Sequence, residues 1–212
     1  HDITPGWADS VKKVLSVIES RIPEYESMTL SNGIFFERTK GVGVLDGELA
    51  LELGITGPIL RASGVDHDLR RDAPYHAYDE IEVKVASQPG GDCWSRSVVR
   101  LAEIRESIRI VRALIDSVPE GPICGYKPIK LVGQVKIPSG QIYSAMESSR
   151  GELGTYVIAG GGEGNVSPYR LKIRPPSFHA LSALPYLLPG HMVADAVVIL
   201  GSLDPIMGEV DR

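Results

Sequence analysis

The spacing of apolar residues predicts a mainly helical first half. Apolar side chains recur every three or four positions in two long stretches, which places them on one face of a helix. The first stretch follows Thr4-Pro5, a typical helix start, and the second follows the capping residue Asp92. Asn32-Gly33 and Asp46 mark short helices between them. The two apolar sets are Trp7, Val11, Val14, Leu15, Ile18 and Ile22, and Trp94, Val98, Leu101, Ile104, Ile108, Val111 and Ile115.

Residues 56–80 lose this periodicity and are rich in Gly, Pro, Arg and Asp. We expect a long ordered loop there, a length that is uncommon unless the loop is functional or covered by a partner. Ile81, Val83 and Val85 then alternate with charged residues, which predicts a half-buried strand.

The second half changes to short alternating runs at 142–147, 154–158 and 169–173, which predict an antiparallel sheet. Helices are expected from about Ser177 and from about Gly190. We therefore divide the chain into a mainly helical part (1–118), a small antiparallel sheet (119–176), and C-terminal helices with a buried tail (177–212). The glycines at 160–162 are interpreted as a hairpin turn, because a phosphate-binding loop would continue into Lys-Ser/Thr and a helix.

Composition excludes several classes of protein. The chain has 212 residues, of which 43% are hydrophobic and 23% charged, and a net charge of -5. These values are ordinary for a soluble globular protein and give no general attraction to nucleic acid, which is not expected as a partner. Cys93 and Cys124 lack neighbours at ligand spacing, so neither a disulfide framework nor a zinc site is predicted. The apolar run 181–200 contains prolines, His191 and Asp195, and predicts buried helices rather than a membrane span.

Two charged clusters leave alternatives open. The second long helix carries five arginines away from its apolar stripe, which we interpret as a solvated face linked by ion pairs between residues three or four positions apart; a partner-binding surface is the alternative. Asp66-His67-Asp68 is interpreted as hydrogen-bonded loop chemistry, because a metal site would need a third ligand at a defined spacing. The arginines are Arg96, Arg100, Arg105, Arg109 and Arg112.

Three stretches carry a resemblance to a known family: residues 56–80, residues 147–178 ("ESSRGELGTYVIAGGGEGNVSPYRLKIRPPSF") and residues 194–212 ("ADAVVILGSLDPIMGEVDR"). Together they resemble the D subunit of the proton-pumping NADH:quinone oxidoreductase, respiratory complex I, a relative of the large subunit of nickel-iron hydrogenases. The resemblance covers essentially the whole chain but only about the C-terminal half of a family member. We therefore expect the chain to be a fragment whose front has been cut.

The resemblance implies an α+β fold, dominated by helices and like that of the hydrogenase large subunit, with a small antiparallel sheet in its C-terminal part. It implies a peripheral subunit on the cytoplasmic face of the membrane, attached only through the complex. Its partners would be the iron-sulfur and membrane subunits, with quinone as the substrate. FMN and iron-sulfur clusters would belong to partner subunits, so this chain is expected to bind no cofactor.

The terminal stretch carries the site implied by the resemblance. Hydrogenases end in Asp-Pro-Cys-x-x-Cys, whereas Ile206 and Glu209 stand at the two cysteine positions here. Isoleucine offers no metal donor, so hydrogenase activity is excluded and no metal is expected. Quinone contact is carried over to Asp204, Ile206, Met207 and Arg212. The residues alone would instead favour Ile206 and Met207 as core residues and Arg212 as a salt-bridge partner.

Arg174 and Asp195 form a second set, as a cavity residue and a member of a polar network. For Asp195, a satisfied core aspartate is the alternative. Opposite charges near the sheet, at Glu147, Arg150, Glu152, Arg170 and Arg174, are expected to form buried or partner-facing pairs.

No catalytic residue is expected here, because the His and Tyr that bind the quinone headgroup in the family belong to the missing half; the fragment alone would be inactive. Two other functions remain open: a structural module without catalysis in a hydrogenase-related energy-converting complex, and the same subunit in a complex that uses reduced deazaflavin or ferredoxin as donor.

Overall fold

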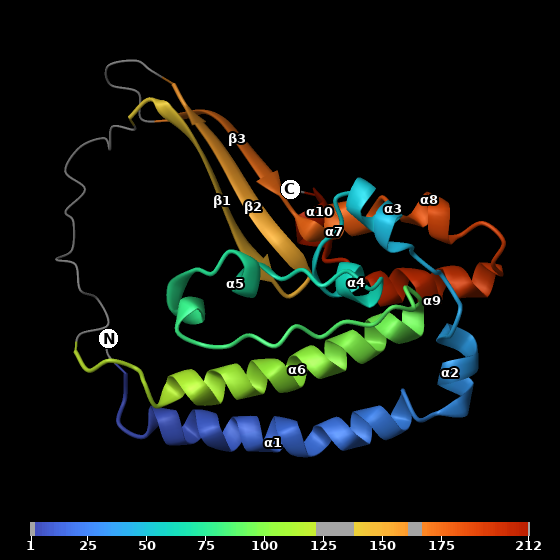
Figure 1. Cartoon of the computed structure of the whole chain (residues 1–212), viewed down its shortest axis with the longest axis horizontal. Coiled ribbons are helices and arrows are strands. Elements are labelled where there is room, and N and C mark those ends of the chain that lie inside the picture. The colour runs from blue at the N-terminus through green and yellow to red at the C-terminus, as the bar shows by residue number, and fades with distance from the viewer. Residues whose placement is uncertain (1–2, 122–137, 161–166, 212) are drawn as a thin grey trace.

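A computed structural model describes residues 3–121, 138–160 and 167–211. Two long helices, α1 (Trp7–Met28) and α6 (Cys93–Ile115), run antiparallel along one side (Figure 1). Short helices lie between them in the sequence: α2 (Gly33–Thr39), α3 (Gly47–Glu52), α4 (Gly57–Ala62), α5 (Leu69–Asp72) and η1 (His76–Asp79). Strands β1 (Gly140–Ser148), β2 (Gly151–Ala159) and β3 (Pro168–Arg174) precede α7 (Pro176–Leu181), α8 (Leu184–Leu187), α9 (Val193–Leu203) and α10 (Met207–Asp211).

Side-chain caps explain where several helices begin. The carboxylate of Asp92 accepts the backbone N–H of Ser95, and Asn32 and Asp46 cap α2 and α3 in the same way. These starts were predicted. Helix α1 differs from its predicted start, because it begins after Gly6 without a side-chain cap.

The main core lies under the C-terminal helices. Apolar side chains from α3, α4 and the start of α6 meet those of α7, α8 and α9. The run 181–200 forms helices as predicted, but only one side of it is buried: Val193 and Val197 are 91% and 75% exposed. A smaller cluster joins α1 to α6. The main core contains Leu45, Ala50, Ile55, Ile59, Leu60, Cys93, Ala180, Ala183, Leu187, Ile199 and Leu203; the smaller one contains Leu15, Ile22 and Ile108.

The structure differs from the prediction in which faces of α6 are buried. Ile104 and Val111 of the expected apolar stripe are 40% and 39% exposed, whereas Arg96 is completely buried. Arg105 and Arg112 pair with Glu26 and Glu19 of α1 at 2.6 and 2.7 Å. These two pairs join α6 to α1, whereas the expected pairs were between residues three or four positions apart on the same helix; Arg109 with Glu106, at 2.6 Å, is such a pair. A uniformly solvated face is wrong, because α4 and α9 pack on α6 from other sides.

Two further predictions on the first half are corrected. The ordered stretch 56–80 is no irregular loop: it contains α4, α5 and η1, and every residue of α4 is buried. Residues 81–85 form no strand; they run extended along α6, where the carboxylate of Glu106 accepts the backbone N–H of Lys84 at 2.8 Å. Alternation alone could not reveal that the partner of this segment is a helix side chain.

The predicted sheet is confirmed. Its order is β1-β2-β3, both pairs are antiparallel, and Tyr143, Tyr156 and Lys172 occupy one row. The sheet projects from the helical body at an angle to α6 (Figure 1). Glycines 161 and 162 of the expected hairpin turn, and most of the connection before β1, lie outside the described residues. The α+β, helix-dominated fold with a small antiparallel sheet is as expected.

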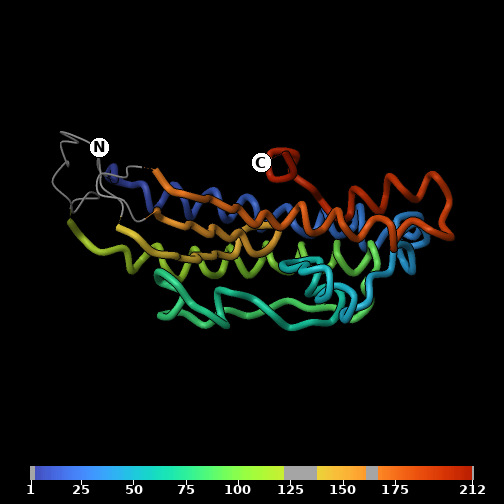
Figure 2. Tube along the Cα trace, turned by 90° about the horizontal axis from the view of Figure 1, so that it is seen from above, coloured from blue at the N-terminus to red at the C-terminus, as the bar shows by residue number. Residues whose placement is uncertain are grey.

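The tail is not buried in this chain. Met207 is 63% exposed and Ile206 39%. Figure 2 shows the C-terminal segment projecting from the body. The reason is that α10 packs on one side, against α7. There the carboxylate of Glu209 accepts hydrogen bonds from the backbone N–H and the hydroxyl of Ser177.

Candidate functional site

Asp204 stands where α9 ends and the terminal segment begins. Its backbone is left-handed, with φ 53° and ψ 52°, and its N–H donates to the carbonyl of Gly201. Aspartate tolerates this conformation better than most residues, because its short polar side chain can hydrogen-bond locally. The turn directs residues 205–211 away from the axis of α9.

Two arginines from distant elements meet at Asp204. Arg150, in the turn between β1 and β2, places Nη2 2.9 Å from Oδ2 of Asp204, and its Nε donates to the Asp204 carbonyl at 3.3 Å. Arg100 of α6 donates from Nη1 to the Ser202 carbonyl at 2.7 Å and keeps Nε 3.9 Å from the same carboxylate oxygen. Guanidinium groups are favourable here because the last carbonyls of a helix carry partial negative charge. Burial nevertheless lowers the pKa of Arg100.

Asp204 and Arg100 also lie in the walls of two cavities. The first, about 570 Å³, opens between α1, α6 and the β1–β2 turn; the second, about 380 Å³, lies between α2, α6 and α9. Volumes of this size suit a small organic ligand. The first cavity is polar at Arg61, Arg100 and Arg150 and apolar at Leu15, Ile18, Ile104, Ile108 and Val111. The second is lined by Phe35, Thr39, Cys93, Ser97, Val198, Gly201 and Ser202 besides Arg100 and Asp204.

The other residues carried over from the resemblance lie elsewhere. Ile206 and Met207 line neither cavity but face outward on the segment that follows Asp204. Arg212 lies outside the described residues. Of these residues, Asp204 lines the two cavities, whereas Ile206 and Met207 do not.

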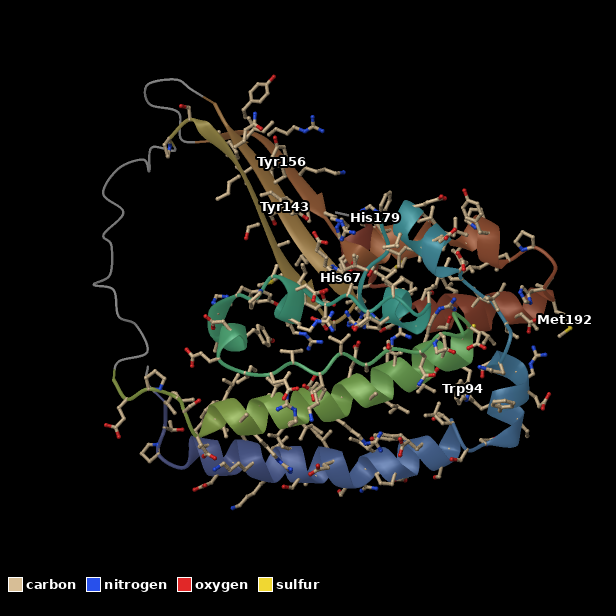
Figure 3. The ribbon with its side chains drawn as sticks, in the orientation of Figure 1. His67, Trp94, Tyr143, Tyr156, His179 and Met192 are labelled. Carbon is tan, nitrogen blue, oxygen red and sulfur yellow. The ribbon has the colours of Figure 1, made fainter. Side chains whose placement is uncertain are left out.

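The second set does not gather at this site. Arg174 donates to the carbonyls of Glu152 and Gly54 at 2.8 and 2.5 Å, away from both cavities. Asp195 is buried at the opposite end of α9, where it accepts the backbone N–H of Met192 at 3.1 Å and pairs with Arg38 at 2.6 Å. Figure 3 shows Met192 at that far end. Asp195 is thus a satisfied core aspartate that caps its helix.

Sequence reasoning missed a buried ionic cluster next to the first cavity. Arg61, on the otherwise apolar α4, is 1% exposed and meets Glu103 at 2.7 Å, Glu147 at 2.9 Å and Asp68 at 3.4 Å. Arg70 holds Asp68 through two nitrogens, at 2.9 and 2.6 Å. The available signal was a lone arginine within the apolar residues of a short helix. Its partners lie far away in the sequence, and no local pattern indicates them.

Charge and burial compete in this cluster. Burial alone would lower the pKa of Arg61, but the three carboxylates outweigh it and leave that pKa raised. The pKa of Asp68 is lowered because its hydrogen bonds and charge interactions with the two arginines exceed the effect of burial, whereas burial raises the pKa of Glu147. Of the charged residues expected to form pairs near the sheet, Glu147 forms a buried pair with Arg61, Arg174 lies 3.9 Å from Glu152, and Arg150 pairs with Asp204.

The Asp66-His67-Asp68 sequence is loop chemistry, as interpreted. Nδ1 of His67 lies 2.9 Å from Asp72, Arg71 holds Asp66, and Asp68 belongs to the ionic cluster. His67 lies near the base of the sheet (Figure 3). Within residues 3–121, 138–160 and 167–211, no three His, Cys, Asp or Glu side chains are placed to hold a metal ion.

Comparison with known proteins identifies the family. A sequence family described as respiratory-chain NADH dehydrogenase, 49 kDa subunit, matches residues 1–212. The chain belongs to this family. The match runs through the terminal motif and through the two other stretches that carry the resemblance.

Curated relatives agree along the whole chain. The D subunit of NADH-quinone oxidoreductase from Methylacidiphilum infernorum is 42% identical, and the one from Clostridium beijerinckii is 43% identical; each alignment covers 100% of this chain and 55% of the relative. The corresponding protein of Dehalococcoides mccartyi is 44% identical over 100% of this chain and 56% of its own length. The chain thus spans about half the length of these relatives.

A solved structure supports the fold. A chain of the membrane-bound sulfane sulfur reductase, an archaeal respiratory membrane complex, superimposes with a TM-score of 0.89 at 34% identity, covering 98% of this chain and 56% of that one. In the part of this 49 kDa subunit family member that the structure describes, no helix has both the length and the apolar character needed to span a bilayer.

Proposed function

We propose that this chain forms part of the wall of the quinone chamber in a membrane-associated NADH-quinone oxidoreductase. It would lie in the peripheral arm on the cytoplasmic face, against the subunit that carries the terminal iron-sulfur cluster and above the membrane subunits. Electrons would arrive from that cluster, while FMN and the clusters stay in partner subunits. The chain would supply surface and charge rather than a redox group.

The observation that carries this proposal is the position of Asp204. It belongs to the 49 kDa subunit family's terminal stretch, lies in the walls of two ligand-sized cavities, and is followed directly by the exposed apolar residues Ile206 and Met207. A carboxylate beside guanidinium groups offers polar contacts to a headgroup, and flexible apolar side chains suit a hydrophobic tail. Glu209, at a former metal-ligand position, is instead held by Ser177.

Substitutions in the full-length subunit within its complex test the proposal. Asp204→Ala and Met207→Trp are expected to lower NADH:quinone reductase activity roughly tenfold, the size expected when a charged hydrogen bond or a fitted contact is lost. NADH oxidation with an artificial acceptor at the flavin should stay unchanged, because that reaction bypasses the quinone chamber. Steady-state assays with both acceptors measure the difference.

Met192→Trp is the matched control, because Met192 is 59% exposed, close to the 63% of Met207, but lies at the opposite end of α9. It should leave both activities at the wild-type level. Unchanged quinone kinetics in both Asp204→Ala and Met207→Trp would contradict the proposed site.

A second candidate function follows from the solved structure that superimposes on this chain. That protein is titled a sulfane sulfur reductase, so the same fold occurs in a respiratory complex named for another acceptor. The alternative is that this chain serves a complex with a different donor, such as reduced deazaflavin or ferredoxin, or a different acceptor. Assays of the purified complex with NADH, reduced ferredoxin, quinone and polysulfide would separate the two: turnover only with a non-quinone acceptor would favour this candidate.

A further inference from the structure

We infer that Arg150 is a positioning residue for Asp204, and that Arg100 fixes the end of the helix from which Asp204 emerges. The inference rests on the proposed function and adds to it the side chains that set the geometry of the chamber wall. Arg150 comes from the sheet and Arg100 from α6, so three elements converge on the start of the terminal segment.

The turn that carries Arg150 packs closely against the start of α4. Gly151 has φ +129°, and a Cβ on Gly57 would lie 2.4 Å from the Gly151 Cα and 2.5 Å from the Arg150 carbonyl oxygen. The hydroxyl of Thr56 also accepts the backbone N–H of Glu152 at 2.9 Å. The backbone from the Arg150 carbonyl to Glu152 is therefore held against residues 56 and 57, which fixes the position from which the guanidinium group extends.

The two arginines contact different groups at the end of α9. Arg150 contacts both the carboxylate and the carbonyl of Asp204, at 2.9 and 3.3 Å. Arg100 makes its close hydrogen bond to the carbonyl of Ser202, within the last turn of α9, and approaches the carboxylate only to 3.9 Å. Arg150 thus sets the direction of the Asp204 side chain, whereas Arg100 holds the last carbonyls of α9.

This geometry places one carboxylate at the boundary between the two cavities, since Asp204 and Arg100 line both. Without Arg150, the carboxylate would keep Arg100 as a neighbour and could turn toward it. A ligand headgroup would then meet Asp204 in a wrong position. Small misplacements of a binding group weaken binding strongly, because alignment is lost even though the group remains.

The test uses the full-length subunit in its complex. Arg150→Gln is expected to raise KM for a short-chain quinone roughly three- to tenfold with a smaller change in kcat, and Arg150→Lys should recover part of the loss because it retains one charged donor. In a double-mutant cycle, adding Arg150→Gln to Asp204→Asn should raise KM little further, because the partner is already lost. Arg170→Gln, an exposed arginine of β3, is the matched control with wild-type kinetics.

The outcomes separate the two proposals. If Asp204→Ala raises KM but Arg150→Gln does not, the positioning role is wrong and the chamber proposal stands. If neither changes quinone kinetics, the chamber proposal fails first. Additive effects of Arg150→Gln and Asp204→Asn on KM would overturn the positioning role. So would a fall in both kcat and thermal stability that accompanies the rise in KM, because it would indicate that Arg150 supports the fold in general.

Discussion

Arg61 stands at the centre of a buried ionic cluster. Its guanidinium neutralises carboxylates from α6, β1 and the segment before α5, and all of these groups lie in or near the protein interior. Removing one partner from a buried ionic cluster leaves the others uncompensated, which costs more than the pairs themselves contribute.

Arg61→Leu is therefore expected to lower the free energy of unfolding by about 3–5 kcal/mol. Urea unfolding of the chain, followed by the fluorescence of Trp7 and Trp94, measures it. Arg71→Leu is the control, because Arg71 makes its pairs at the surface and should change stability by less than about 1 kcal/mol. Equal losses in the two variants would show that the cluster adds nothing beyond surface pairing.

Residue roles were predictable from sequence where their partners are local. The caps Asn32, Asp46 and Asp92 bond to N–H groups within three residues of themselves, and their positions before apolar periods indicated them. Arg61 and Arg150 were not predictable in this way, because Glu147 is 86 and Asp204 is 54 residues away.

At the scale of the element, the start of α6 joins two helices. Oδ1 of Asp92 accepts the N–H of Ser95 at 2.7 Å, and Oδ2 accepts the N–H of Gly41, just after α2, at 2.9 Å. Burial would raise the pKa of Asp92, but these N–H groups and Lys40 outweigh it and lower that pKa. The carboxylate therefore stabilises the fold above its unfolded-state pKa, and this contribution is lost as pH falls through its lower folded-state pKa.

Asp92→Asn is expected to lower the free energy of unfolding at pH 7 by about 1–2 kcal/mol, because the amide retains one oxygen acceptor instead of two. The difference from wild type should shrink as pH is lowered below about 4, where Asp92 of the unfolded wild-type chain takes up a proton before that of the folded chain. Urea unfolding between pH 7 and pH 3 measures this. Asp46→Asn, with one backbone bond at an exposed cap, is the control; a pH-independent difference for Asp92→Asn would contradict the electrostatic account.

Elements were predicted correctly where the periodicity of their own sequence determines them. They were predicted incorrectly where packing against a neighbouring element determines them. The three strands, whose sequences alternate, form the predicted antiparallel sheet with β2 between β1 and β3. Residues 81–85 alternate as well, but their backbone bonds to a side chain of α6, so they form no strand. Helix α6 shows the same limit: only part of its predicted apolar stripe is buried, whereas packing against α4 and α9 buries Arg96.

At the scale of the whole molecule, the sheet meets the helical body where Gly57 touches the β1–β2 turn. Gly57 has φ +74°, and an added Cβ would collide with backbone atoms of Arg150 and Gly151. Because neither backbone can yield easily, Gly57→Ala should destabilise the chain by roughly 2–4 kcal/mol and shift the turn. Gly33→Ala is the control, since Gly33 begins α2 with nothing near its Cβ position.

Circular dichroism and urea unfolding of both glycine variants measure the effect. A Gly57→Ala chain as stable as Gly33→Ala would show that the sheet and the helical body can separate without cost. The contact between these two parts could not be predicted from sequence, because glycine marks many turns and nothing local distinguishes one that faces another backbone.

The contact between the β1–β2 turn and the end of α9 also indicates which mutations should compensate for one another. A change in this turn would alter the terminal segment without touching it, and a compensating change in either could restore the other. Under the proposed function, a selection for resistance to inhibitors of the quinone chamber should recover alleles at Arg150 and Gly151 alongside those at Asp204. Second-site revertants of a defective tail would map to codons more than fifty positions upstream.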